Sequence, residues 1–581
     1  MPVHSQPRAA GATLLRPRVW IKAIHFVNRF NLELAQHETL VVVGPNNAGK
    51  SLFLLELQVT ITDGPAATIK FLVRDVELEA NSTAAMVVEW AKSITTRSPG
   101  QPPNDPMLDL PISRMNQTHV HQQWQRGLGG NGFQNLASLF SVFLSADGRL
   151  NLTQPVNTPN FAIEIPTHPL HHLYEDDEIE ARLSKMVRRA FGLELVVNRA
   201  AGSQIPLHLA EAKPEPPPGK DRLSKEYRQA VSSLPQVVAQ GDGIKAFVGL
   251  LLHTLVLHHD ITLVDEAEAF LHPPQARLLG HLLATERPRP SQLIVATHSS
   301  DILKGLLDAG GSPVRVVRVQ RKAGETIVAE LKPDLVKEVW RDPLLRYSGI
   351  FDGLFHQGVI VCESDSDCRF YGAMMDALSG EDRSHDLLLV HGGGKARTPN
   401  IIRALTAIEV PVRAVFDFDV LSEEAVLQRT VEALRGSWSD LRADWNTVRA
   451  AIEGKRPELA TRDVSEKVMA TLSKVKTDIL PKQAILEIRE TLRSASAWSE
   501  AKRTGKAFVP RGEQTAAYER LASRLTELGV HLVEVGELEG FCRSVGNHGP
   551  AWTVEVLERD LVSDPELSEA RTFANKLLAG W

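Results

Sequence analysis

Cysteine is scarce in this sequence, and no apolar stretch is long enough to cross a membrane. Only three cysteines, Cys362, Cys368 and Cys542, occur in 581 residues. They are too few and too scattered for a disulfide framework or a zinc knuckle, and a reducing compartment suits them best. The apolar runs stay below the ~18 residues that a spanning helix needs, and MPVHSQPRAAGATLLRPRVW lacks the apolar core of a signal peptide. We therefore expect a cytoplasmic protein with no membrane partner.

An excess of positive charge is also missing. The formal net charge is −6, so the chain as a whole is not attracted to nucleic acid. A nucleic-acid partner would have to be held by a local basic patch or through metal ions. The apolar content of 43% and the charged content of 23% are those of an ordinary globular protein. A chain of 581 residues is too long for one core, so two or three domains are expected.

The most specific feature is a glycine-rich loop between an apolar strand and an apolar helix. The stretch ETLVVVGPNNAGKSLFLLEL contains the pattern G-x-x-x-x-G-K-S, with β-favouring residues before it and a helical pattern after it. Backbone N–H groups of such a loop surround phosphates, and the dipole of the following helix adds to the attraction. The lysine reaches the β- and γ-phosphates, and the serine hydroxyl binds Mg²⁺. The pattern predicts an ATP site formed by Gly44, Asn46, Asn47, Ala48, Gly49, Lys50 and Ser51.

Two later strands supply the other side chains that a nucleotide triphosphatase needs. The apolar run in HDITLVDEAEAFLHPPQ ends at Asp265 and Glu266, and the run in SQLIVATHSSDIL ends just before His298. We predict that Asp265 binds the Mg²⁺ shell, and that Glu266 polarises the attacking water. A histidine at a strand end is more often structural, but its position after the acidic strand favours a role for His298 near the γ-phosphate.

These motifs resemble the ABC-type ATPase heads of the SMC-like and OLD families, which assemble their ATP site from two subunits. The resemblance implies a homodimer or a higher homo-oligomer. It also implies that QGDGIKAFVGLLLHTL contains the signature loop, although Gln240 stands where these families have serine. Heptads do not persist anywhere, so the long coiled coil of SMC-like heads is not expected. We expect an ATPase domain at 1–345, with insertions within about 97–135 and 165–230.

Carboxylates end two strands expected in the second half of the chain. The apolar run in VIVCESDSDCRFYGAMMDAL stops at Glu363, and the run in PVRAVFDFDVLSEE stops at Asp417 and Asp419. Acidic residues and serines at such places also serve as simple helix caps. Parallel strands, however, bring their carboxyl ends to one edge of a sheet, and alternate residues of a strand share a face. We therefore expect these three carboxylates to converge on Mg²⁺ or Mn²⁺, beside the glycine turn at 392–394.

This order of strand ends resembles the TOPRIM domain of topoisomerases, primases and OLD nucleases. An ABC-type head followed by a TOPRIM domain is the arrangement of the OLD (overcoming lysogenization defect) family, and the sequence is identified as a member of it. The resemblance implies further metal ligands at Asp367 and Glu539, with Glu537 beside the latter. It also implies a catalytic lysine after the last acid. Lys576 is the only lysine there, and its role is left open; Lys395 is an alternative contact to a phosphate.

The expected fold class is α/β: an ABC-type P-loop ATPase domain followed by a TOPRIM (Rossmann-like) nuclease domain with a helical insertion. We expect the TOPRIM domain at 354–545, with the insertion at about 421–529, and a C-terminal helical tail at 546–581. The insertion is charged, and the sequence fits a lid that faces nucleic acid as well as a solvated bundle without such a role.

Two functions follow from the sequence and the resemblance. The first is an ATP-binding and ATP-hydrolysing endonuclease that depends on Mg²⁺ or Mn²⁺ and acts in antiphage defence, with DNA favoured as substrate. The alternative is a scaffold that senses a nucleotide or a phage protein and whose TOPRIM domain cleaves RNA, for example tRNA. An accessory defence protein is a possible partner in both.

Overall fold

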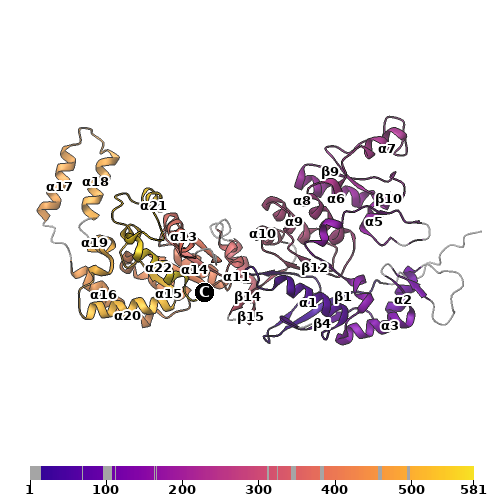
Figure 1. Ribbon diagram of the computed structural model, residues 1–581, viewed down its shortest axis with the longest axis horizontal. Helices are drawn as coiled ribbons and strands as arrows, with labels where there is room; N and C mark the ends of the chain where they lie inside the picture. The colour runs from indigo at the N-terminus through magenta and orange to yellow at the C-terminus, as the bar shows by residue number, and fades with distance from the viewer. Residues whose placement is uncertain are drawn as a thin grey trace, which may run out of the picture. The chain divides into compact units, whose positions relative to one another are not determined.

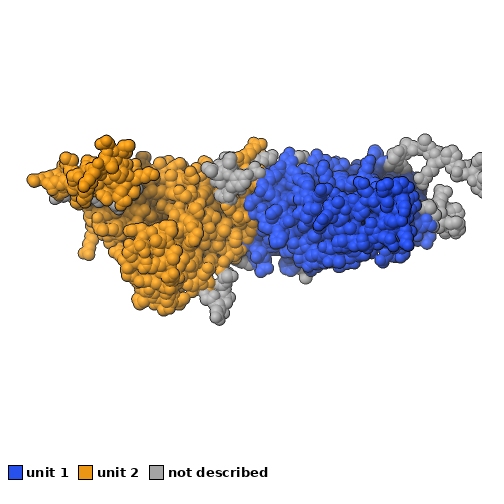
Figure 2. Space-filling view, turned by 90° about the horizontal axis from the view of Figure 1, so that it is seen from above, with its two compact units in different colours: residues 1–333 blue, residues 334–581 orange. Residues whose placement is uncertain are grey.

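The chain forms two compact units, residues 1–333 and 334–581, which Figure 2 shows in blue and orange. The computed structural model describes residues 15–67, 70–95, 107–110, 113–161, 164, 166–310, 313–322, 325–341, 349–379, 385–455, 461–493 and 497–581. Parts of the N-terminal stretch tested for a signal peptide and of the expected insertion at about 97–135 lie outside these residues. Within them, no helix has both the length and the apolar character that a membrane crossing needs.

The first unit is built on a six-stranded sheet with the order β15-β14-β3-β13-β12-β7. Its strands are parallel except for the pair β14 and β15. All five residues of β3, β12 and β13 are buried, as expected for parallel strands that are covered on both faces. The strands are β3 (Thr39–Val43), β7 (Ser141–Leu144), β12 (Ile261–Asp265), β13 (Gln292–Ala296), β14 (Val314–Lys322) and β15 (Glu325–Leu331).

Helices and a small antiparallel sheet accompany this central sheet (Figure 1). The small sheet has the order β2-β1-β4 and shares a hydrophobic core with the helix that follows β3. Its strands are β1 (Val19–Phe26), β2 (Asn31–Glu33) and β4 (Val73–Ala80). The helices are α1 (Lys50–Asp63), α2 (Ala84–Ile94), α3 (Gln117–Arg126), α8 (Asp242–Leu251), α9 (Pro273–Thr285) and α10 (Ser300–Asp308).

A smaller α/β layer lies between α3 and α8 in the chain. It pairs β9 with β11 in an antiparallel manner, and α6 packs against β9. Its elements are α5 (Pro169–Glu175), α6 (Asp177–Phe191), β9 (Glu194–Val197), β11 (Leu207–Ala210) and α7 (Lys225–Ser232).

The second unit contains a four-stranded parallel sheet with the order β17-β16-β18-β19. Since all four strands run the same way, their carboxyl ends lie at one edge of the sheet. The strands are β16 (Gly358–Cys362), β17 (Leu387–His391), β18 (Val412–Phe416) and β19 (Val530–Leu532). Two helices connect them in βαβ order, α13 (Asp365–Ser379) and α14 (Thr398–Ala407).

Between β18 and β19 the chain forms a series of helices. Two of them, α17 and α18, extend as a hairpin from this part of the unit (Figure 1), and α16 packs against α19 and α20. The helices are α15 (Glu424–Ala433), α16 (Arg442–Gly454), α17 (Thr461–Ser473), α18 (Lys482–Arg493), α19 (Ala497–Thr504) and α20 (Glu513–Glu527).

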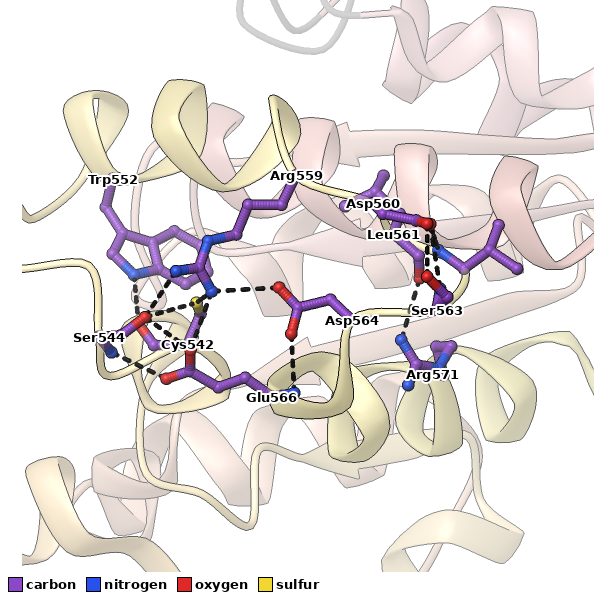
Figure 3. Close-up of polar contacts among 11 residues, drawn as sticks. Cys542, Ser544, Trp552, Arg559, Asp560, Leu561, Ser563, Asp564, Glu566 and Arg571 are labelled. Atoms are coloured by element: carbon purple, nitrogen blue, oxygen red, sulfur yellow. Dashed lines mark hydrogen bonds and ion pairs between the residues drawn. The ribbon is translucent and has the colours of Figure 1, made fainter.

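The C-terminal segment closes the second unit. Helices α21 (Pro550–Leu557) and α22 (Ser568–Leu578) pack on α13 and share its core. Figure 3 shows Arg559 directed at four side chains: its Nη1 lies 2.9 Å from Cys542 Sγ, 3.2 Å from Asp564 Oδ2 and 2.8 Å from Glu566 Oε2, and its Nη2 donates to the Ser544 hydroxyl at 2.7 Å. Trp552 Nε1 donates to the Cys542 carbonyl at 3.1 Å. The segment that follows β19 is thus fixed to the tail by buried and charged contacts.

Candidate active sites

The glycine-rich loop connects the end of β3 to the start of α1. Gly49 caps the helix in the left-handed region, with φ 101°. Gly44 has φ 148°, and a Cβ atom there would lie 2.0 Å from the backbone oxygen of Val319. Only glycine can occupy that position, because the loop runs directly against the neighbouring strand β14. The close contact fixes the loop at the carboxyl end of the sheet.

Lys50 and Ser51 begin α1 and make different contacts. The Lys50 ammonium donates to the carbonyls of Gly44 at 2.7 Å and Pro45 at 2.8 Å, and the residue is only 4% exposed. The Ser51 hydroxyl donates to Asp265 Oδ1 at 3.1 Å. Burial raises the pKa of Asp265, partly offset by the Ser51 hydrogen bond. The hydroxyl and the carboxylate together offer the hard oxygen ligands that Mg²⁺ prefers.

Glu266 and His298 lie next to each other at the ends of β12 and β13. His298 Nε2 is 3.4 Å from Glu266 Oε1. Burial and the nearby Lys50 ammonium lower the pKa of His298, against the opposite effect of Glu266. The backbone of Glu266 is in the left-handed region, with φ 47°. This conformation is unfavourable for a non-glycine residue, so the surrounding structure must hold it.

Two residues that the sequence did not indicate, Arg149 and Glu268, hold the backbone around Glu266 and His298 in place. The fully buried Arg149 donates through Nη2 to the carbonyls of Asp265 and Glu266, both at 2.6 Å, and through Nη1 to that of Ala267 at 3.2 Å. The half-buried carboxylate of Glu268 accepts from the Thr297 hydroxyl at 2.6 Å and from the His298 backbone N–H. The local pattern SADGRL gives no sign that Arg149 supports the ATP site. The signal for Glu268 is its position, two residues after Glu266.

A cleft of about 590 Å³ adjoins the glycine-rich loop. Its size is within the range of small-molecule and cofactor sites. The lining combines loop backbone with apolar and charged side chains, including Asn47, Ala48, Gly49, Phe71 and Arg321. Together with the hydrogen-bonded pair Ser51 and Asp265, these residues fit a nucleoside triphosphate and its Mg²⁺. The expected signature loop lies at the start of α8, where Gly241 caps the helix.

In the second unit three carboxylates converge at the edge where β16 and β18 end. Ligand oxygens of Glu363, Asp417 and Asp419 lie within 4.8 Å of one another; we call these residues the first carboxylate cluster. Glu363 Oε1 also accepts the backbone N–H of Asp417 at 3.0 Å. The parallel sheet thus brings together residues that are far apart in the sequence.

The expectation that Asp417 and Asp419 share a face of the strand was wrong. β18 ends at Phe416, and Asp419 lies in a 3-10 turn at Phe418–Ser422. Alternation along a strand therefore does not bring the two carboxylates together. The turn does so instead, because it folds the chain back at the strand end while Phe418 fills the core.

Burial disfavours the charged form of two members of the first carboxylate cluster, Glu363 and Asp417. Burial and the nearby Asp417 carboxylate raise the pKa of Glu363 to about 8. Burial also raises the pKa of Asp417 to about 7, against the opposite effect of Lys502. Asp419 Oδ1 is buried without a hydrogen-bond partner among the described residues. Buried like charges and an unpartnered oxygen are the properties of a site that fits a divalent cation.

A second group of possible ligands faces the same cleft. Glu537, Glu539 and His548 also offer ligand atoms within 4.8 Å of one another; we call them the second acidic cluster. Asp367 lies in the first turn of α13, and its Oδ2 accepts from the Ser364 backbone N–H at 2.8 Å. Burial raises the pKa of both Asp367 and Glu537. The cleft, of about 590 Å³, is lined by residues of both clusters and by Asp367.

The lysine in this cleft is not the one that the resemblance implied. Lys576 lies on α22, whose last turn contacts Arg413 near the start of β18, away from the strand ends that carry the carboxylates. Lys502, on α19, lines the cleft and places its ammonium 2.9 Å from Asp417 Oδ2. Lys395 contacts Asp419 Oδ2, also at 2.9 Å. No local pattern in the sequence distinguishes Lys502 from its charged neighbours.

Two family models match parts of the chain. The one described as "AAA domain, putative AbiEii toxin, Type IV TA system" matches residues 177–304, which include Asp265, Glu266 and His298. The one described as "Overcoming lysogenization defect protein-like, TOPRIM domain" matches residues 354–419, which include the first carboxylate cluster. Among curated proteins, none matches the chain.

Solved structures of ATPase heads resemble the chain. The SMC head bound to the C-winged helix domain of ScpA is 12% identical over 55% of this chain and 99% of that one, with a TM-score of 0.33. The SMC head domain from Thermotoga maritima is 11% identical over 55% and 100%, with a TM-score of 0.26. The cbiO1 protein from Clostridium perfringens, part of the ABC transporter complex cbiONQ, is 14% identical over 57% and 95%, with a TM-score of 0.25.

The expected fold class, an α/β ATPase domain followed by a TOPRIM domain with a parallel sheet, is confirmed. The chain is a fusion of an AAA-type ATPase domain and an OLD-like TOPRIM domain.

Proposed function

We propose that the chain is an ATP-hydrolysing, divalent-metal-dependent endonuclease whose first carboxylate cluster is the centre of phosphodiester cleavage. One observation carries this proposal: three carboxylates from two separate parts of the chain lie within 4.8 Å of one another at the edge of a TOPRIM sheet. Such a group, half-buried and with a pKa raised to about 8 at Glu363, is unfavourable without a cation.

In this proposal Glu363, Asp417 and Asp419 hold Mg²⁺ or Mn²⁺, and Asp367, Glu537 and Glu539 complete the acidic lining. A bound cation would polarise the phosphodiester and lower the pKa of a bound water. The glycine turn adds open backbone: a Cβ atom at Gly393 or Gly394 would meet no other atom within 4 Å. This part of the cleft therefore leaves room for a sugar–phosphate backbone to approach.

The ATP site would work from the residues that the first unit brings together. Lys50 supplies positive charge to the phosphates, Ser51 and Asp265 hold Mg²⁺, and Glu266 orients the attacking water. His298, kept neutral by a lowered pKa, can accept or donate a hydrogen bond at the γ-phosphate. Arg149 keeps the acidic loop in place.

The resemblance to ABC-type heads and OLD nucleases supports the remaining proposals. We infer that two copies complete each other's ATP site, with the loop before α8 of one copy facing the phosphates of the other. We also infer a cytoplasmic protein that acts in antiphage defence, with or without an accessory defence protein. DNA is the favoured substrate; cleavage of RNA such as tRNA is the alternative.

The test is a cleavage assay with three substrates: supercoiled DNA, linear DNA and total tRNA. Each is incubated with purified protein and Mg²⁺ or Mn²⁺, with and without ATP. We expect cleavage that disappears with a chelator and in Glu363→Ala. The matched control is Glu569→Ala, which removes an exposed carboxylate of α22 and should cleave like the wild type. Cleavage of tRNA alone would support the alternative substrate, and no cleavage of any substrate would contradict the proposal.

A further inference from the structure

The helical insertion places one ammonium group between the two acidic clusters. Lys502 Nζ lies 2.9 Å from Asp417 Oδ2 and 3.9 Å from Asp419 Oδ2, both in the first carboxylate cluster. It also lies 3.9 Å from Glu537 Oε2, in the second acidic cluster. The side chain is 35% exposed, so the ammonium is open to the cleft while it contacts both clusters.

Backbone contacts fix Lys502 in this position. Gly536 has φ 114°, and a Cβ atom there would lie 2.1 Å from the Lys502 carbonyl oxygen. A Cβ atom at Gly505 would lie 2.0 Å from the Glu534 carbonyl oxygen, which also accepts the Lys506 N–H at 2.8 Å. The end of α19 is thus packed directly on the loop that carries Glu537 and Glu539. Glycine is required at both crossings because any side chain would separate the two segments.

The side chain of Lys502 brings positive charge into an acidic cleft. Lysine is ordinarily protonated at neutral pH, and the Lys502 ammonium lies 2.9 Å from the Asp417 carboxylate. A compact ammonium with several donors is a suitable contact for phosphate oxygens.

The two other lysines considered for this role are placed less well. Lys395 forms ion pairs of 2.9 Å with both Asp419 and Glu423, and it is not among the residues that line the cleft. Lys576 lies on α22 near Arg413. Among the described lysines, Lys502 is therefore the one that lines the cleft and contacts both clusters.

We propose that Lys502 is a catalytic residue of the nuclease site, supplied by the helical insertion, and that its ammonium contacts the scissile phosphate. This inference rests on the proposed nuclease function. It gives the insertion a chemical role, because α19 becomes part of the active site. When cations and substrate occupy the cleft, the ammonium exchanges its contact with Asp417 for a phosphate oxygen.

The reaction itself is a hydrolysis. The oxygen of water forms a bond to phosphorus, and the ester bond between phosphorus and the leaving oxygen breaks. The water gives up one proton, and the leaving oxygen takes up one, so the reaction consumes one water. Lys502 transfers no proton in this step; it stabilises the negative charge that grows on the phosphate oxygens, in the manner of other fixed cationic and dipolar groups.

The test compares Lys502→Ala and Lys502→Arg with Arg503→Ala, a matched control that removes the neighbouring, 74% exposed cation of the same helix. Cleavage of the substrate that the wild type cuts is measured together with Mn²⁺ binding by calorimetry without substrate. We expect Lys502→Ala to lower the cleavage rate on the order of 100-fold, with partial recovery in Lys502→Arg. Mn²⁺ binding should become tighter, on the order of tenfold, since a nearby positive charge is lost.

Each outcome separates the inference from the function on which it rests. A wild type that cleaves and a Lys502→Ala protein that cleaves equally well would overturn the inference alone. Faster cleavage by Lys502→Ala would also overturn it, since the ammonium would then act as an inhibitor of cation binding. Weaker Mn²⁺ binding by Lys502→Ala would mean that the lysine only holds the clusters together. A wild type that cleaves no substrate would overturn the proposed function and this inference with it.

Discussion

Replacing Glu363 by glutamine should stabilise the metal-free protein. The pKa of Glu363 is about 8 in the folded chain, against an ordinary value of 4.5. At pH 7 the folded state must therefore keep a proton that the unfolded state has released. At pH 7 the cost is set by the distance of about 2.5 units between this pH and the ordinary pKa, and it corresponds to about 3 kcal/mol at 1.36 kcal/mol per unit. Glutamine has the same shape, still accepts the Asp417 N–H through its oxygen, and avoids this cost.

The assay is thermal unfolding of both proteins in a chelator. A gain of about 3 kcal/mol should raise the melting temperature of the second unit by about 6–12 °C. The sign follows from proton binding: the folded state binds more protons than the unfolded state between pH 4.5 and 8, so wild-type stability falls as pH rises through this window. The advantage of the variant should accordingly shrink to about 1 kcal/mol or less at pH 5.

Adding Mn²⁺ should reverse the order of the two proteins. The stability that the wild type gains grows with the logarithm of the ratio of Mn²⁺ concentration to Kd and reaches about 4.1 kcal/mol at 1,000 times the Kd, which exceeds the advantage of the variant. Glu363→Gln gains less, because it has lost a charged ligand. Glu569→Gln, on the exposed face of α22, serves as the control and should melt like the wild type in all conditions. If Glu363→Gln melts at or below the temperature of the wild type in a chelator at pH 7, the Glu363 carboxyl does not destabilise the metal-free protein.

Two further variants and one mass measurement test other parts of the structure. Glu266→Gln should bind ATP but hydrolyse it about 100-fold more slowly or worse, because the water loses its orienting carboxylate; a wild-type rate of phosphate release would be inconsistent with that role. Arg149→Met should destabilise the first unit by about 2–4 kcal/mol, because three buried carbonyls lose their donor, and an unchanged denaturation midpoint would count against this. Light scattering at micromolar concentration with ATP should give a dimer or larger species, and a strictly monomeric mass would contradict the proposed assembly.

The parts of the structure that the sequence predicted best are the strand ends. β3, β12 and β16 are continuous apolar runs that stop at glycine, aspartate or glutamate, and the run itself marks the end of the strand. The parallel arrangement then follows from the alternation of strands and helices. For this reason the sequence alone places Glu363, Asp417 and Asp419 at one edge of the sheet.

The parts that the sequence did not predict depend on contacts between distant segments. The local pattern around Asp417 did not show whether the strand continued or turned, and the turn decides how Asp417 and Asp419 meet. Lys502 reaches the cleft only because α19 returns to the loop before Glu537, where Gly536 allows the close approach. Arg149 likewise acts through carbonyl oxygens, which leave no trace in the pattern of side chains.

The most direct test of the account measures cleavage and ATP hydrolysis in the same preparation of an Asp417→Ala, Asp419→Ala double variant. The two carboxylates belong to the first carboxylate cluster, and the ATP site is built on the separate sheet of the first unit. We expect metal-dependent cleavage to be lost while ATP hydrolysis stays close to the wild-type rate. Cleavage at the wild-type rate by this variant, with its fold intact by melting, would show that the carboxylate cluster is not the nuclease centre.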